Sequence, residues 1–149
     1  MFGSAPLEDS PFTDLGKLEM LTEELTNFTY RASLDGYLVE TLPDFLMVSA
    51  RPTDLVIQRT RFLPGAGPWH YHPGASFVRV LTGNIMVQKY TKEGVVDTPV
   101  RGPGDVYYES GYEVHRAVVV SQDPVWLLVV RFGVPVGAEI TTVVNPFEK

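Results

Sequence analysis

Residues 65–83, which read GAGPWHYHPGASFVRVLTG, carry the strongest structural signal in the chain. His70 and His72 lie one residue apart within a run rich in β-forming residues. Side chains in a strand alternate between its two faces, so these two imidazoles project from the same face. Two neutral imidazoles that converge on one side form half of a site for a divalent metal ion.

The third histidine, His115, lies 43 residues after His72 and opens another β-type run. Residues 104–115, GDVYYESGYEVH, lead into it through a turn. If the two strands lie side by side, all three rings meet inside one barrel. A single histidine is more often a surface or core residue than a ligand, so spacing alone leaves both interpretations open.

Both stretches resemble the sequence motifs of the cupin family. Residues 65–83 resemble the first motif, in which an HxH pair is followed by an acidic residue and then by a glycine, and residues 104–115 resemble the second. The resemblance spans roughly residues 55–133, and all three histidines fall on the family's histidine positions. It implies a small jelly-roll β-barrel with His70, His72 and His115 as metal ligands.

The chain departs from the family pattern at the residue that usually completes the metal set. Many cupins have a glutamate four residues after the second histidine, where this chain has Ser76. In the second motif, Ser110 takes the usual proline position and Val119 the usual asparagine position. The chain resembles small microbial cupins that carry HxHPG without the acidic residue. This implies a three-histidine site, unless another residue supplies a further ligand.

The rest of the chain predicts an all-β fold, a single cupin-type jelly-roll barrel with a short N-terminal helical segment. Three leucines at helical spacing predict one helix within residues 13–25. We divide the chain into a lead-in with this helix, residues 1–28, and a barrel domain, residues 29–149. Strands are predicted at Tyr37–Thr41, Phe45–Ala50, Asp54–Phe62, Trp69–His72, Phe77–Thr82, Ile85–Tyr90, Thr98–Val100, Asp105–Glu109, His115–Ser121, Val125–Phe132 and Ile140–Val144.

Composition and charge limit the function classes. The 149 residues are 44% hydrophobic and 20% charged, as in a globular domain. Because the chain has no cysteine, it has no disulfide, thiolate ligand or cysteine nucleophile. The net charge of −6 argues against nucleic acids and anionic membranes as partners. No apolar run approaches the roughly 18 residues of a membrane helix and no signal peptide is present, so we expect a cytoplasmic protein.

Three imidazoles leave the charge of a divalent metal, whether Fe, Zn, Mn or Ni, uncompensated by its ligands. The ion would therefore attract anionic oxygen, as in enolates, β-dicarbonyls and catechol-like groups. We expect a metal-dependent enzyme acting on a small carbonyl, enol-type or aromatic substrate. With iron it would be a dioxygenase, and with the other metals an isomerase, cyclase or lyase. The alternative is a non-catalytic cupin that binds a small ligand.

Further polar residues are candidates for the same cavity. Glu109 and Tyr108 are the expected general acid or base. Gln58 and Gln88 are possible weak fourth ligands, and Ser76 is positioned to hydrogen-bond a metal-bound water. Five arginines lie in predicted strands and are expected to coat the outer sheet face, although one turned inward would bind an acidic substrate: Arg59, Arg61, Arg79, Arg116 and Arg131.

The run Val125–Val130, VWLLVV, is apolar at every position. A strand covered on both faces explains such a run. Small cupins often form dimers through their sheets, so the resemblance implies a homodimer.

Overall fold

The computed structural model describes residues 27–34, 38–42, 45–49 and 53–148. No helix occurs among these residues, and hence none that is long and apolar enough to cross a membrane. The helix expected within residues 13–25 lies outside the described part of the chain. The division of the chain after residue 28 stays a prediction, and the first described strand begins at Phe28.

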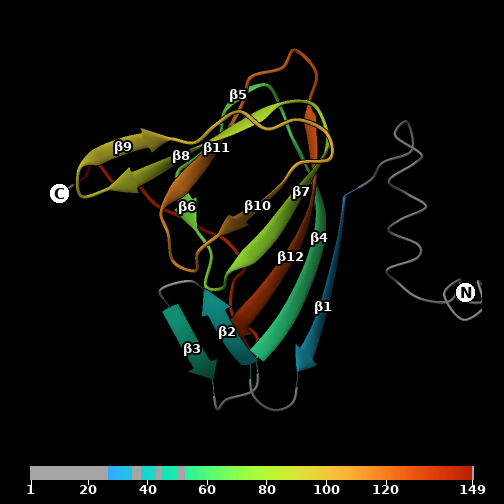
Figure 1. Ribbon diagram of the computed structural model, residues 1–149, viewed down its shortest axis with the longest axis vertical. Coiled ribbons are helices and arrows are strands. Elements are labelled where there is room, and N and C mark those ends of the chain that lie inside the picture. Colours follow the sequence, from blue (N-terminus) through green and yellow to red (C-terminus); the bar gives the residue numbers. More distant parts are fainter. Residues whose placement is uncertain (1–26, 35–37, 43–44, 50–52, 149) are drawn as a thin grey trace, which may run out of the picture.

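The described residues form strands connected by turns and loops (Figure 1). The strands are β1 (Phe28–Leu34), β2 (Leu38–Leu42), β3 (Phe45–Ser49), β4 (Thr53–Phe62), β5 (Gly65–Ala66), β6 (His70–Tyr71), β7 (Ser76–Thr82), β8 (Ile85–Thr91), β9 (Gly94–Asp97), β10 (Val106–Glu109), β11 (His115–Val119), β12 (Val125–Pro135) and β13 (Thr142–Val143).

Two antiparallel sheets make up the body of the fold. The first sheet has the strand order β1-β4-β12-β7-β10. The second has the order β13-β6-β11-β8-β9, with β5 added beside β11, and β2 and β3 form a separate two-stranded sheet. Most neighbours in the two main sheets are distant in sequence, as in a jelly roll, and β8 and β9 are the consecutive pair. The all-β fold class predicted from the sequence is confirmed.

The hydrophobic core lies between the two main sheets. Its members alternate along the strands with residues that face outward, as the period of a strand requires. On β12, for example, Val125, Leu127 and Val129 are buried, whereas the residues between them are partly exposed. The other core residues are Val78, Val80, Ile85, Val87, Tyr107, Ala117 and Val119.

Most predicted strands occur close to their expected positions, but two edges of the sheets differ. Strand β1 was not predicted, and the strand expected at Thr98–Val100 is wrong, because the edge strand is β9, Gly94–Asp97. Gly94 adopts a positive φ of 109°, which lets the chain turn back directly after β8. Val95 and Val96 on β9 are both exposed, so this strand has no alternating pattern for a sequence reading to detect.

Candidate metal centre

The three histidines converge at one end of the barrel interior. His70 lies on β6, His72 follows directly after it, and His115 begins β11, where it is the antiparallel partner of His70. All three side chains are buried. Their ring centroids lie 4.6 to 5.3 Å apart. The alternation argument therefore placed the first two rings correctly, and the pairing of β6 with β11 adds the third.

Backbone carbonyl oxygens fix the orientation of each ring. The Nδ1 atom of His70 lies 2.8 Å from the oxygen of Pro68, and that of His115 lies 2.9 Å from the oxygen of Glu113. A carbonyl oxygen only accepts, so Nδ1 carries the proton and donates it. Nε2 is then the nitrogen left to bind a metal, the arrangement in which histidine ligands are usually held.

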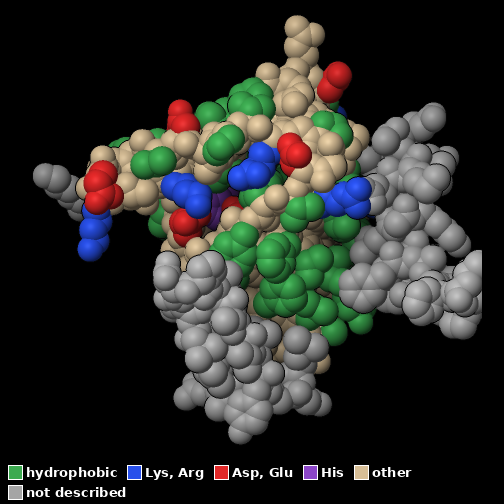
Figure 2. Space-filling view, in the orientation of Figure 1, with side chains coloured by type: hydrophobic (Ala, Val, Ile, Leu, Met, Phe, Trp, Pro, Cys, Tyr) green, Lys and Arg blue, Asp and Glu red, His purple; other side chains and the backbone are tan. Residues whose placement is uncertain are grey.

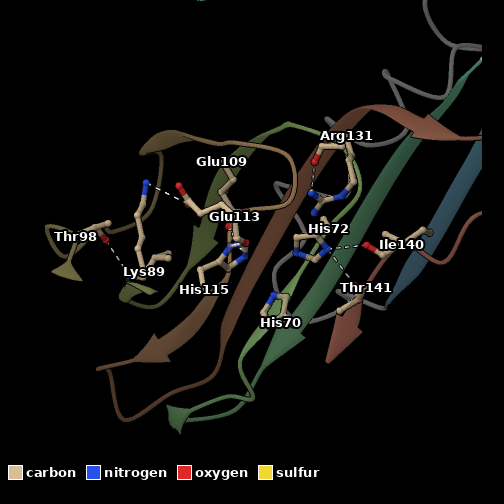
Figure 3. Close-up of polar contacts among 12 residues, drawn as sticks. His70, His72, Lys89, Thr98, Glu109, Glu113, His115, Arg131, Ile140 and Thr141 are labelled. Atoms are coloured by element: carbon tan, nitrogen blue, oxygen red, sulfur yellow. Dashed lines mark hydrogen bonds and ion pairs between the residues drawn. The ribbon is translucent and has the colours of Figure 1, made fainter. Parts of the chain in front are cut away.

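The C-terminal part of the chain holds the remaining ring. Nδ1 of His72 lies 2.8 Å from the carbonyl oxygen of Ile140 and 3.2 Å from the hydroxyl oxygen of Thr141 (Figure 3). The three histidines each offer one ring nitrogen, and these nitrogens lie within 4.8 Å of one another. Metal–imidazole bonds of about 2.1 Å would draw the rings slightly closer. The donor set and its orientation thus fit one divalent ion.

Burial keeps two of these imidazoles neutral, as metal binding requires. Removal from water lowers the pKa of His72 to about 3, and the positive charge of Arg131 contributes in the same direction. Burial also lowers the pKa of His70 below its ordinary value. Neither ring needs to lose a proton at neutral pH before it binds a metal.

Glu109, on β10, brings a carboxylate to the same place. Its Oε2 atom lies 2.7 Å from Nε2 of His115 (Figure 3). Burial alone would raise the pKa of Glu109, but the hydrogen bond and charge of His115 help to hold it at about 2. Glu109 is the cross-strand partner of Ser76, the position at which the first motif lacks its glutamate. A neighbouring strand therefore supplies a carboxylate beside the ion that the histidines would bind.

A cavity of about 220 Å³ opens onto the histidines. Burial raises the pKa of the Tyr107 phenol above its ordinary value, so this group stays neutral. The cavity is lined by Gln58, Thr60, Phe62, Gly67, Pro68, His70, His72, Val87, Tyr107, Glu109, His115, Ala117, Leu127, Val129, Arg131 and Thr141.

The structure separates the other predicted site residues. Gln58 lines the cavity. Gln88 does not, because its amide bonds to Asp97 and Arg116 on the other face of β8 from Val87. Ser76 is fully buried and points inward, as alternation predicts, but does not line the cavity.

Tyr108, the second residue expected to act as a general acid or base, faces away from the cavity. Tyr108 precedes Glu109 on β10 and therefore points to the opposite face, where its ring packs against Phe77 with centroids 5.5 Å apart. Tyr108 is thus absent from the cavity lining, and Tyr107 is the tyrosine that faces it.

The expectation that all five arginines coat the outer sheet face is wrong for Arg131, which is turned inward, and Arg59 is also buried, at 3% exposure against the ring of Phe28. The side chain of Arg131 is 2% exposed and lines the cavity, where Figure 3 shows it directed toward His72. The inward direction of Arg131 could have been predicted from the alternation along β12, because Arg131 continues the buried series of Leu127 and Val129. No comparable signal exists for Thr141, whose role depends on the return of the chain after β12.

Comparison with known proteins agrees with this geometry. Residues 58–131 match the family model described as "Cupin domain". No curated protein matches the chain significantly.

Solved structures resemble the fold over about three fifths of the chain. Peruvianin-I, a cysteine peptidase from Thevetia peruviana latex, superposes with a TM-score of 0.52 at 20% identity and covers 61% of this chain and 56% of its own. A chain from the structures of two DMSP lyases superposes with a TM-score of 0.51 at 20% identity, and the match covers 61% of this chain and 44% of that one. A mutant of Bacillus subtilis oxalate decarboxylase superposes with a TM-score of 0.52 at 16% identity, and the match covers 61% of this chain and 24% of that one. The chain thus spans 24 to 56% of the length of these solved chains. With the motif spacing, the two-sheet barrel and the family match in agreement, the chain contains a cupin domain.

Proposed function

We propose that the chain is a metal-dependent enzyme that acts on a small carbonyl or enol-type substrate. The observation that carries this proposal is the orientation of the three histidines. Each Nδ1 is committed to a backbone carbonyl, which leaves Nε2 of His70, His72 and His115 as the ligand atoms for one ion. Nε2 of His115 also contacts Oε2 of Glu109, so a metal bound there would replace the proton of this hydrogen bond. Buried imidazoles held in this way are costly to maintain unless they bind something.

A divalent metal in this site would polarise a substrate oxygen as a Lewis acid or, as iron, would activate oxygen. Imidazole ligands accept Fe, Zn, Mn and Ni alike, so the donor set does not select among them. The fold does not select the reaction either, since unrelated chemistries share one fold. Dioxygenase, isomerase, cyclase and lyase activities all remain within the proposal.

Residues of the chain itself would orient the substrate and move protons. Glu109 is a buried carboxylate beside His115 and is placed to accept a proton from carbon next to a substrate carbonyl. The neutral phenol of Tyr107 is a hydrogen-bond donor on the cavity wall. Apolar side chains such as Leu127 and Val129 line other parts of the wall.

Metal content of the untagged protein, measured by mass spectrometry, tests the proposal. We expect near-stoichiometric metal in the wild type and in a Gln88→Ala control, since Gln88 lies outside the cavity. His72→Ala should lose the metal. Iron would direct the search to oxygen-uptake assays with catechol and diketone substrates, and another metal to non-redox chemistry beside a carbonyl. No metal in any of the three proteins would refute the enzyme and favour the alternative, a cupin that binds a small ligand without catalysis.

A further inference from the structure

Arg131 places a cation inside the cavity with few partners. Its guanidinium carries five N–H donors. Among the described residues it makes one hydrogen bond, from Nη1 to the carbonyl oxygen of Gly74 at 3.1 Å. Its Nε atom is buried without a partner. A buried charge is costly unless it is paired and hydrogen-bonded, so this arrangement requires an explanation.

The acids near Arg131 do not form an ion pair with it. The negative charge of Glu109 acts to raise the pKa of Arg131, but Oε2 of Glu109 is held by His115 at 2.7 Å. In the described part of the chain, no acidic side chain lies in ion-pair contact with Arg131. Burial lowers the pKa of Arg131 to about 10, which leaves the guanidinium charged at neutral pH. The cavity therefore keeps a fixed positive charge beside the histidines.

Ser76 adds a second unsatisfied polar group next to Arg131. Arg131 on β12 is the partner of Ser76 on β7, and Ser76 is in turn the partner of Glu109 on β10. The three residues thus form a row across three strands. The Ser76 hydroxyl is buried without a hydrogen-bond partner. Cβ atoms of such cross-strand neighbours lie about 5 Å apart, so the wall behind the cavity holds two polar groups whose hydrogen-bonding capacity is not filled by the protein.

We propose that Arg131 binds the carboxylate of the substrate, and that the substrate is a small acid with a carbonyl or hydroxyl oxygen for the metal. The planar guanidinium matches a carboxylate with two parallel hydrogen bonds. The cavity volume of about 220 Å³ is smaller than the roughly 300–1,000 Å³ of pockets for drug-sized ligands, which favours a small acid. This inference rests on the proposed function for the metal contact, but its carboxylate contact is independent of the metal.

Calorimetric binding of pyruvate and its neutral isostere pyruvamide to the Zn²⁺-loaded full chain tests the proposal. The variants are Arg131→Gln, which removes the charge, and Arg131→Lys, which keeps the charge without the fork. We expect Arg131→Gln to reduce the preference for pyruvate over pyruvamide by roughly 10- to 100-fold, the usual effect of a charged hydrogen bond. Arg131→Lys should fall between this variant and the wild type. The metal attracts anions equally in all three proteins, so its effect cancels when the preferences are compared.

A structural role for Arg131 would give a different result. Loss of the bond to Gly74 would lower the melting temperature or metal content but leave the pyruvate preference unchanged, and that outcome overturns the proposal. If Arg131→Gln does not fold, Arg131→Lys decides, because a preference equal to that of the wild type refutes recognition by the fork. Acetate binding to metal-free His72→Ala, with and without Arg131→Gln, separates the two proposals. Binding that depends on Arg131 in this metal-free variant supports the carboxylate contact, and binding that is unchanged by Arg131→Gln refutes it. The proposed function fails separately, if the wild type takes up no metal.

Discussion

Gly74, in the turn after the histidine pair, has no room for a side chain. A Cβ atom built there would lie 2.1 Å from the carbonyl oxygen of Phe132 and 3.1 Å from a methyl carbon of Val134. The backbone of Phe132 cannot easily move away, because its N–H donates to the carbonyl oxygen of Ala75 at 2.8 Å. The carbonyl oxygen of Gly74 also accepts the bond from Arg131. Gly74→Ala must therefore shift the turn away from β12.

The expected change in stability follows from two opposing effects. A Gly→Ala change at a compatible position stabilises a protein by about 0.4–1 kcal/mol through the unfolded state. Forcing an extra carbon into a closely packed site costs about 1–3 kcal/mol. We expect Gly74→Ala to lower the free energy of unfolding by about 1–2 kcal/mol, which is roughly 2–8 °C in melting temperature for a chain of this size. Because His72 lies two residues earlier, metal content should fall as well.

Gly67→Ala is the matched control. It lies in the same stretch of sequence, but its Cβ would be 3.6 Å from the carbonyl oxygen of Ala117, an ordinary contact. Urea unfolding at neutral pH, with the midpoint and slope compared for both variants and the wild type, measures the difference. Equal midpoints for Gly74→Ala and Gly67→Ala would refute the steric argument. A Gly74→Ala variant more stable than the wild type would do the same.

Three further predictions follow from other parts of the structure. Thr141→Val removes one of two acceptors at Nδ1 of His72, so metal affinity in a chelator competition should fall by about tenfold or less, the low end for such outer contacts; an unchanged affinity would contradict this. Hydrophobic side chains gather over β7, β12 and β4, where Phe77 is 49% exposed (Figure 2). We expect light scattering to show a dimer in the wild type and a monomer in Phe77→Glu. A monomeric wild type would refute this prediction. Arg31 holds the pKa of Asp54 below its usual range, so the carboxylate stabilises the fold at pH values above the unfolded pKa of about 4. The difference in unfolding free energy between the wild type and Asp54→Asn should therefore shrink as the pH falls below that value. A difference that stays constant with pH would be inconsistent with the ion pair.

The histidine pair was predictable because strand alternation is a local rule. His70 and His72 share a face at any position of their strand in the barrel, so no knowledge of the fold is needed to bring them together. His115 is different, since it meets His70 only through the pairing of β6 with β11. That pairing follows from the order of strands in the second sheet. The family resemblance supplied this order, and the residues alone did not.

The same rule, applied further, selects between two residues that the sequence left side by side. Tyr108 and Glu109 are adjacent on a strand, so only one of them can face the cavity. Tyr107 and Glu109 are both buried, whereas Tyr108 lies on the outer face. Alternation along β10 favours Glu109 once the inward face is known, but the inward face depends on which neighbour β10 pairs with. Local sequence therefore narrows the choice, and the sheet register decides it.

Register also changes the meaning of Ser76. Along the first motif alone, a serine in place of a glutamate indicates that a metal ligand has been lost. Across the sheet, Ser76 is flanked by Arg131 and Glu109, both buried and both lining the cavity. A glutamate at residue 76 would add a third charged side chain to this row and a second carboxylate next to Glu109. The serine leaves space for the carboxylate that β10 supplies. The first motif alone thus indicates that the carboxylate is missing, although Glu109 on the neighbouring strand β10 supplies one.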